Sequence, residues 1–187
     1  MCVWWVVAGL AQRLSMYKLR ARVSIDPIEL QISRGIGIGP KGAFVDPRHE
    51  KMGWRYYGAL EIDHADIDWS ALRVTHQIPE TSAELIPNDS YILEFGFEAL
   101  NGVDFKKGCY VGQEVTARMK HKTELRKGLA TVRVDGSAPE GTEITANGKP
   151  VGRLHTQSDR QGLAYLRFDR AGADMVAGDA VVHYDKP

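Results

Sequence analysis

The sequence predicts an α+β protein in which a mixed N-terminal part is followed by a small antiparallel β-barrel. The last third of the chain holds five or six short β-branched segments within about sixty residues, and turn signals such as "NGKP" at 147–150 separate them. The first two thirds mix helical and strand-like spacings with glycine- and proline-rich turns. We therefore place a first domain at residues 1–124 and the barrel at 125–187.

Composition excludes several classes of function. Lys plus Arg and Asp plus Glu each number 24, so the chain has no overall field that favours a nucleic acid or a membrane. The two cysteines, Cys2 and Cys109, form no disulfide framework and are typical of a reducing compartment. They are too few to hold an iron–sulfur cluster within one chain, and the six histidines are scattered. We expect no tightly bound metal.

The N-terminal segment has two interpretations. The apolar run from Met1 to Leu10 is too short to cross a bilayer, and its basic, acid-free continuation resembles a mitochondrial presequence. We prefer a helix packed through Leu10, Leu14 and Tyr17, at i, i+4 and i+7. This helix would lead into a strand over residues 20–33, with Pro27 at a bulge or edge.

Further elements follow in order. "RGIGIGPKG" at 34–42 departs from G-x-G-x-x-G, and no helical pattern follows, so it favours a glycine-rich turn or exposed loop, with a phosphate cradle as the weaker alternative. "AFVDPRHEKMGWRYY" at 43–57 combines an Asp-Pro turn with an aromatic strand. A short helix is expected over Trp69–Thr75, before a polar connection.

The stretch "KKGCYVGQEV" at 106–115 carries the most chemistry. From Gly112 onward the spacing is helical, with Val111, Val115 and Met119 on one face. Cys109 would then lie just before a helix N-terminus, where free N–H groups and the helix dipole favour a thiolate or an anionic ligand.

Local charge adds to this expectation. Between Lys106 and Lys127 there are seven Lys or Arg residues against two Glu residues. The residues alone leave three interpretations of the stretch open: a reactive or ligand-binding cysteine, a buried inert thiol, and a solvated basic helix face. A protease-like triad has little support, because His121 stands alone.

The stretch "KGCYVGQE" resembles the K-G-C-Y-x-G-Q-E signature of the YgfZ/GcvT-like folate-binding proteins, in their iron–sulfur assembly branch. Other segments resemble the family in the same order along the chain. These are "MYKLRARV" (16–23), "DPR" (46–48), "GWR" (53–55), "LNGVDFKKGCYVGQEVTARM" (100–119) and the approach to the barrel at 121–129.

The resemblance implies the remnant of a GcvT-like folate-binding domain followed by a C-terminal β-barrel. Relative to the family, the chain is expected to lack part of the N-terminal domain, which contributes to the central folate cavity. The implied function is a tetrahydrofolate-binding accessory factor for assembly or repair of iron–sulfur proteins, radical-SAM tRNA-modifying enzymes among the clients. The expected partners are folate and iron–sulfur client or assembly proteins, with no membrane and no direct nucleic acid.

The resemblance also assigns site residues. The signature thiol falls on Cys109, which we expect to be the functional residue facing a folate cavity at the domain junction. The residues expected to bind the cofactor are Lys107, Gly108, Tyr110, Gly112, Gln113, Glu114, Arg118, Glu94 and Arg73. Gln77 stands where the family has a glycine.

Two other functions remain as alternatives: a folate-dependent aminomethyltransferase-like one-carbon transfer, and a non-catalytic module that docks a protein or tRNA. An accessory factor is preferred to an enzyme, because general-base candidates are limited to Glu94 and Glu114. We expect a bacterial cytoplasmic protein, with the mitochondrial matrix as the alternative.

Overall fold

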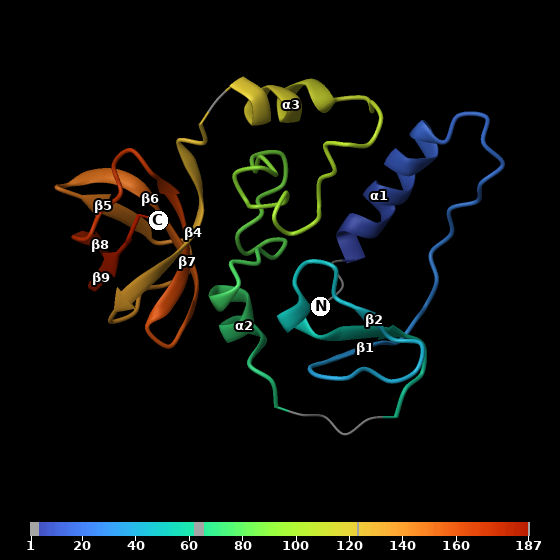
Figure 1. The fold of residues 1–187 in the computed structure, drawn as a ribbon, viewed down its shortest axis with the longest axis horizontal. Helices are drawn as coiled ribbons and strands as arrows, with labels where there is room; N and C mark the ends of the chain where they lie inside the picture. Colours follow the sequence, from blue (N-terminus) through green and yellow to red (C-terminus); the bar gives the residue numbers. More distant parts are fainter. Residues whose placement is uncertain (1–3, 62–65, 123, 187) are drawn as a thin grey trace.

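A computed structural model describes residues 4–61, 66–122 and 124–186 (Figure 1). It contains a closed six-stranded antiparallel barrel at the C-terminal end and a mixed N-terminal part, which confirms the α+β class with a C-terminal barrel. Figure 1 shows the barrel and a small three-stranded sheet on opposite sides, with α2 and the turns that follow it between them.

The elements have the following bounds: α1 Trp4–Tyr17, β1 Ile32–Gly35, β2 Phe44–Val45, the 3-10 helix η1 Glu50–Met52, β3 Trp54–Tyr57, α2 Trp69–Thr75, α3 Gln113–Lys122, β4 Lys127–Asp135, β5 Glu143–Ala146, β6 Lys149–Ser158, β7 Gln161–Arg167, β8 Met175–Ala177 and β9 Ala180–His183.

The barrel is built from strands whose side chains alternate between the core and the surface, joined by tight turns. Its strands are ordered β4-β7-β6-β5-β8-β9, and β4 pairs with β9 to close it. Inward positions such as Val132, Leu154 and Leu166 are fully buried. The predicted hairpin between β5 and β6 is confirmed, since Asn147 and Gly148 both have positive φ, as a two-residue type I′ turn requires.

The three-stranded sheet, ordered β1-β3-β2, joins the "DPR" and "GWR" segments. Asp46 is buried, and its carboxylate accepts hydrogen bonds from Arg48 and Arg55. Burial alone would raise the pKa of Asp46, but the bonds from Arg48 and the charges of both arginines hold it below its ordinary value. The two segments that resemble the family are thus held by one carboxylate.

The glycine run is a loop from Ile36 onward, as predicted, while Gly35 ends β1, and the structure gives two of its glycines a packing role. A Cβ on Gly35 would lie 2.5 Å from the Trp54 ring, and one on Gly39 would lie 2.8 Å from it. The indole can therefore close over the backbone only because these positions lack side chains.

Two expectations for the N-terminal segment are wrong. Helix α1 forms, but Leu10, Leu14 and Tyr17 are exposed and not packed. The expected strand over 20–33 reduces to the start of β1 at Ile32, because Pro27 lacks an N–H and no described strand pairs with the residues before it. Among the described residues, no helix is long and apolar enough to cross a membrane.

Helix α2 has the bounds that the sequence predicts. The side chain of Asp68 caps its start by accepting a hydrogen bond from the N–H of Ala71 at 2.8 Å. After its end, Gln77 has a φ of +53°, a left-handed conformation that favours glycine. Its Nε2 donates to the carbonyl of Leu129 in β4 at 2.6 Å, which ties the end of α2 to the barrel.

Candidate functional site

The signature cysteine lies in a loop in front of α3. Its thiol is free and exposed, which excludes the buried inert interpretation. Helix α3 begins at Gln113, so three residues separate Cys109 from the helix. The Gln113 side chain reaches back and accepts a hydrogen bond from the Tyr110 N–H at 3.1 Å, and Gly112 supplies the left-handed turn with a φ of +91°.

The same loop encloses a small cavity of about 230 Å³. Lys107 extends over the Tyr110 ring, with its Nζ 4.6 Å from the ring centroid. The cavity is lined by Val103, Asp104, Phe105, Lys107, Gly108, Cys109, Tyr110, Gln113, Thr116, Ala117 and His121. We call this group the Cys109 loop cavity.

Contacts with α3 hold the loop in place. Lys120 binds the Glu98 carboxylate at 2.6 and 2.8 Å, and its Nζ lies 5.4 Å from the Phe105 ring. The Phe105 ring also meets His121 edge to face, with the ring centroids 6.4 Å apart. The helix thus connects the cysteine loop to the turns that precede it.

The loop cavity gathers five of the predicted site residues: Cys109, Lys107, Gly108, Tyr110 and Gln113. Gly112, Glu114 and Arg118 are exposed and do not line it. The apolar face expected on α3 lacks a covering partner among the described residues, since Val111 and Val115 are exposed.

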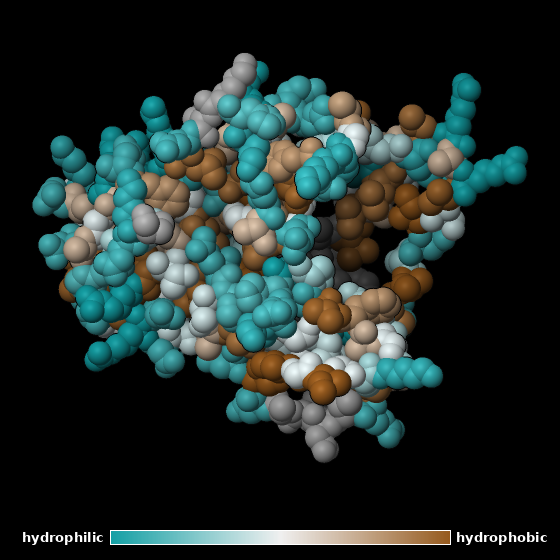
Figure 2. Space-filling model, viewed as in Figure 1, coloured by the Kyte–Doolittle hydropathy of each residue, from teal (hydrophilic) through white to brown (hydrophobic). Residues whose placement is uncertain are grey.

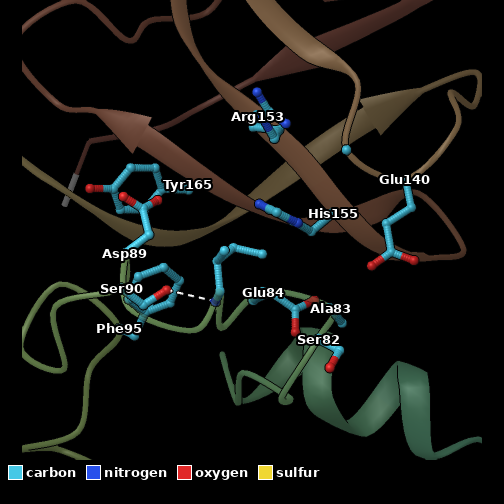
Figure 3. Close-up of a pocket in the computed structure, with 12 residues that line it drawn as sticks. Ser82, Ala83, Glu84, Asp89, Ser90, Phe95, Glu140, Arg153, His155 and Tyr165 are labelled. Atoms are coloured by element: carbon cyan, nitrogen blue, oxygen red, sulfur yellow. Dashed lines mark hydrogen bonds between the residues drawn. The ribbon is translucent and has the colours of Figure 1, made fainter.

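A larger cavity of about 660 Å³ lies at the junction of the turns after α2 with the barrel (Figure 3). Its lining comprises Ser82, Ala83, Glu84, Ile86, Asp89, Ser90, Phe95, Glu140, Gly141, Arg153, His155 and Tyr165. Cys109 is not among these residues, so the expectation that its thiol faces the junction cavity is not met. The structure places the cysteine and the junction in two different cavities.

The junction cavity is built around aromatic and titratable side chains. The rings of Phe95 and Tyr165 stack with centroids 5.3 Å apart, and the Tyr165 hydroxyl donates to Glu94. Burial, and then the bond to Glu94, raise the pKa of Tyr165. His155 is buried, and burial lowers its pKa despite the opposing charge of Glu84, which favours the neutral imidazole.

Arg73 and Glu94 lie on this side of the molecule, away from the cysteine loop. Arg73 is buried, forms an ion pair with the buried Glu84, and donates to the carbonyl of Ile78 at 3.2 Å. Glu84 in turn accepts from the Thr156 hydroxyl of β6 at 2.6 Å. These bonds give Arg73 a role at the junction, while its assignment to a cofactor stays a prediction.

Sequence reasoning missed His155 and Glu84. Leu154 of β6 belongs to the barrel core, whereas His155 lines the junction cavity together with Arg153, so the burial of His155 depends on the turns after α2 and cannot be found from the strand pattern. No group of three or more His, Cys, Asp or Glu residues in the described ranges could hold a metal ion.

Comparisons with known proteins agree with this architecture. Residues 126–187 match the model of the CAF17 C-terminal beta-barrel domain. The iron-sulfur cluster assembly factor IBA57, mitochondrial, of Mus musculus is 31% identical over 195 residues, which cover 88% of this chain and 54% of the mouse protein. The Homo sapiens protein of the same name is 31% identical over 191 residues, which cover 86% of this chain and 54% of the human protein.

These matches support the resemblance of the chain to the YgfZ/GcvT-like family, and residues 126–187 are similar to the CAF17 C-terminal beta-barrel domain. A fungal homologue of IBA57 from Phaeosphaeria nodorum is 28% identical over 209 residues, which cover 86% of this chain and 51% of the fungal protein. The chain therefore spans about half the length of the curated relatives it matches.

Proposed function

We propose that this protein is an accessory factor for the assembly or repair of iron–sulfur proteins, and that Cys109 is its functional thiol. One observation carries the proposal: the signature cysteine is exposed at the mouth of a small cavity. An exposed thiol can be reached by a partner protein or its cluster, whereas a buried thiol cannot. The names of the mouse and human relatives support the same function.

The mitochondrial matrix is the compartment we propose, in place of the bacterial cytoplasm. Its support is that the matched relatives from animals and fungi are named as mitochondrial proteins. Iron–sulfur client or assembly proteins are the proposed partners.

The test is complementation of a cell that lacks its own copy of the factor. Wild-type protein should restore iron–sulfur enzyme activity, and Cys109→Ser should lose most of that rescue at equal protein abundance. Gly172→Ala is the control, because a Cβ at Gly172 meets nothing within 4 Å and this residue lines neither the Cys109 loop cavity nor the junction cavity. Full rescue by Cys109→Ser would remove the thiol from the function.

Tetrahydrofolate is the cofactor we propose for the junction cavity. The Cys109 loop cavity, at about 230 Å³, is below the range of about 300–1,000 Å³ usual for ligand sites, whereas the junction cavity, at about 660 Å³, lies within it. The residues fit the ligand: Arg153 is suited to a carboxylate, the neutral His155 can accept an N–H, and aromatic side chains form part of the wall.

A titration of tetrahydrofolate tests this assignment. Binding should weaken at least tenfold in Arg153→Ala and stay unchanged in Arg118→Ala, because Arg118 does not line the junction cavity. The opposite order of effects would move the cofactor to the cysteine loop.

A further inference from the structure

Three arginines on the small sheet gather around one carboxylate. Arg34 of β1 lies directly opposite Arg55 of β3 in the antiparallel register, so the two side chains share one face of the sheet. Arg48, in the turn after β2, lies beside them, because it and Arg55 both form ion pairs with Asp46, at 2.8 and 2.9 Å. We call Arg34, Arg48 and Arg55 the arginine cluster.

The cluster carries more positive charge than the nearby carboxylates neutralise. Asp46 is buried, and both of its oxygens are occupied: Oδ1 accepts from the Arg48 Nε and Oδ2 from the Arg55 Nε, each at 3.0 Å. Glu80, the other carboxylate whose charge acts on Arg34, forms an ion pair at 3.1 Å with the arginine of α2. Among the described residues, the ion pairs thus leave the Arg34 guanidinium without a carboxylate.

Arg34 and Arg55 repel each other, because like charges directly opposite on neighbouring strands are destabilising. Burial lowers the pKa of Arg34, the charge of Glu80 opposes this shift, and the two other arginines of the cluster add to it. Figure 2 shows hydrophobic residues gathered on the side of α1 and the small sheet, whereas the barrel is mostly hydrophilic. The cluster is thus a group of like charges in a largely apolar region, and a bound anion would relieve their repulsion.

Arg34 is exposed, and an aromatic ring holds it in position. Its guanidinium carbon lies 4.1 Å from the centroid of the Trp69 ring, at the start of α2. This stacking covers the flat face of the guanidinium and leaves the N–H groups at its edge available to a ligand. The planar fork of those groups matches two oxygens of a phosphate or a carboxylate. The direction of the site is therefore fixed before a ligand arrives.

We propose that the arginine cluster binds a phosphate group, with Arg34 donating to the phosphate oxygens and with Arg48 and Arg55 adding positive charge beside it. A phosphate suits the cluster better than a carboxylate does, because it has three acceptor oxygens and a charge of about −1.5 to −2 at pH 7. The phosphate is either inorganic or part of a phosphate ester, since both present the same oxygens. The proposal does not depend on the iron–sulfur function, because none of the three arginines lines the Cys109 loop cavity or the junction cavity.

Titration calorimetry of the full 187-residue chain tests the site, with inorganic phosphate and glycerol 3-phosphate as the probes at constant ionic strength. At least one probe should bind, and the one that binds more tightly identifies the source of the phosphate. Arg34→Met should weaken binding at least tenfold, because it removes the guanidinium and keeps an unbranched side chain. Arg34→Lys should bind with an affinity between those of the wild type and Arg34→Met, since it keeps the charge and loses the fork.

Arg133→Met is the matched control, since Arg133 is an exposed arginine of β4 whose Nη2 lies 3.8 Å from an Asp135 oxygen. It should leave phosphate binding unchanged, and circular dichroism should show that the variants are folded. The proposal is overturned if neither probe binds the wild type at about 10 mM, or if Arg34→Met and Arg133→Met weaken binding equally. Binding that Arg34→Met leaves intact would also overturn it.

Discussion

Glu84 accepts a hydrogen bond from the Thr156 hydroxyl at 2.6 Å and thereby joins the turns after α2 to strand β6 of the barrel. Its other carboxylate oxygen binds Arg73 and accepts from the N–H of Glu80 at 2.9 Å. Glu84 and Arg73 are both buried and both belong to the N-terminal part, so their ion pair holds in place the carboxylate that bonds to Thr156 of the barrel.

Breaking the pair from one side should destabilise the protein strongly. Arg73→Met leaves the Glu84 carboxylate buried without its cation, and we expect a loss of about 3–5 kcal/mol in the free energy of unfolding. Urea denaturation measures this loss. The double variant Arg73→Met/Glu84→Gln should recover part of it, since no buried charge is then unpaired. A single-variant loss below about 1 kcal/mol would contradict the buried pair.

Gln77 provides a test of backbone strain. Both Gln77→Ala and Gln77→Gly remove the bond to Leu129, but only glycine relieves the left-handed backbone at φ +53°. The glycine variant should therefore be more stable than the alanine variant by about 1 kcal/mol in thermal unfolding. Equal stabilities would show that the backbone at residue 77 is not left-handed.

Much of the fold could be predicted from local pattern. The barrel strands alternate and carry their turn residues, and α2 begins after an aspartate cap, so both were found from the sequence. The prediction of a strand over residues 20–33 was wrong, because the alternation of apolar and polar residues does not show whether a partner strand exists. The same reason applies to α1, whose apolar spacing predicted a packed helix while Leu10 and Leu14 are exposed.

The candidate site could be predicted only in part. The signature marked the residues around Cys109, because their identity is local in sequence. The junction cavity could not be found this way: Glu84 and His155 come from segments far apart in the chain and meet only in the folded protein. The position of Cys109 outside that cavity likewise depends on the tertiary path of the loop.

Gly112 and Gly108 should respond differently to alanine. Gly112 has a φ of +91°, so Gly112→Ala strains the turn before α3 and should cost about 1 kcal/mol. The φ of Gly108 is not positive, and a Cβ added there meets nothing within 4 Å. Gly108→Ala should therefore leave the stability nearly unchanged. Thermal unfolding of the two variants checks the prediction, and equal losses would argue against the turn.

The free energy of unfolding should also decrease at acid pH, because His155 becomes protonated on unfolding. Its pKa in the folded protein lies below the ordinary 6.5, because burial opposes the charged form. The unfolded chain therefore binds the proton more readily, and this contribution to stability is complete above pH 6.5 and is lost as the pH falls through the folded pKa. His155→Gln should flatten the decline in unfolding free energy as the pH falls below 6.5, the ordinary pKa of histidine; an unchanged slope would mean that His155 is solvated.

Alkylation measures the accessibility of the Cys109 thiol, on which the proposed function depends. The folded and the urea-unfolded protein are treated with a maleimide, and modification of the Cys109 peptide is followed by mass spectrometry, which separates it from Cys2. We expect the rate in the folded protein to lie within about tenfold of the rate in the unfolded chain, because an exposed thiol is not protected by structure. Protection of Cys109 by a hundredfold or more would contradict it.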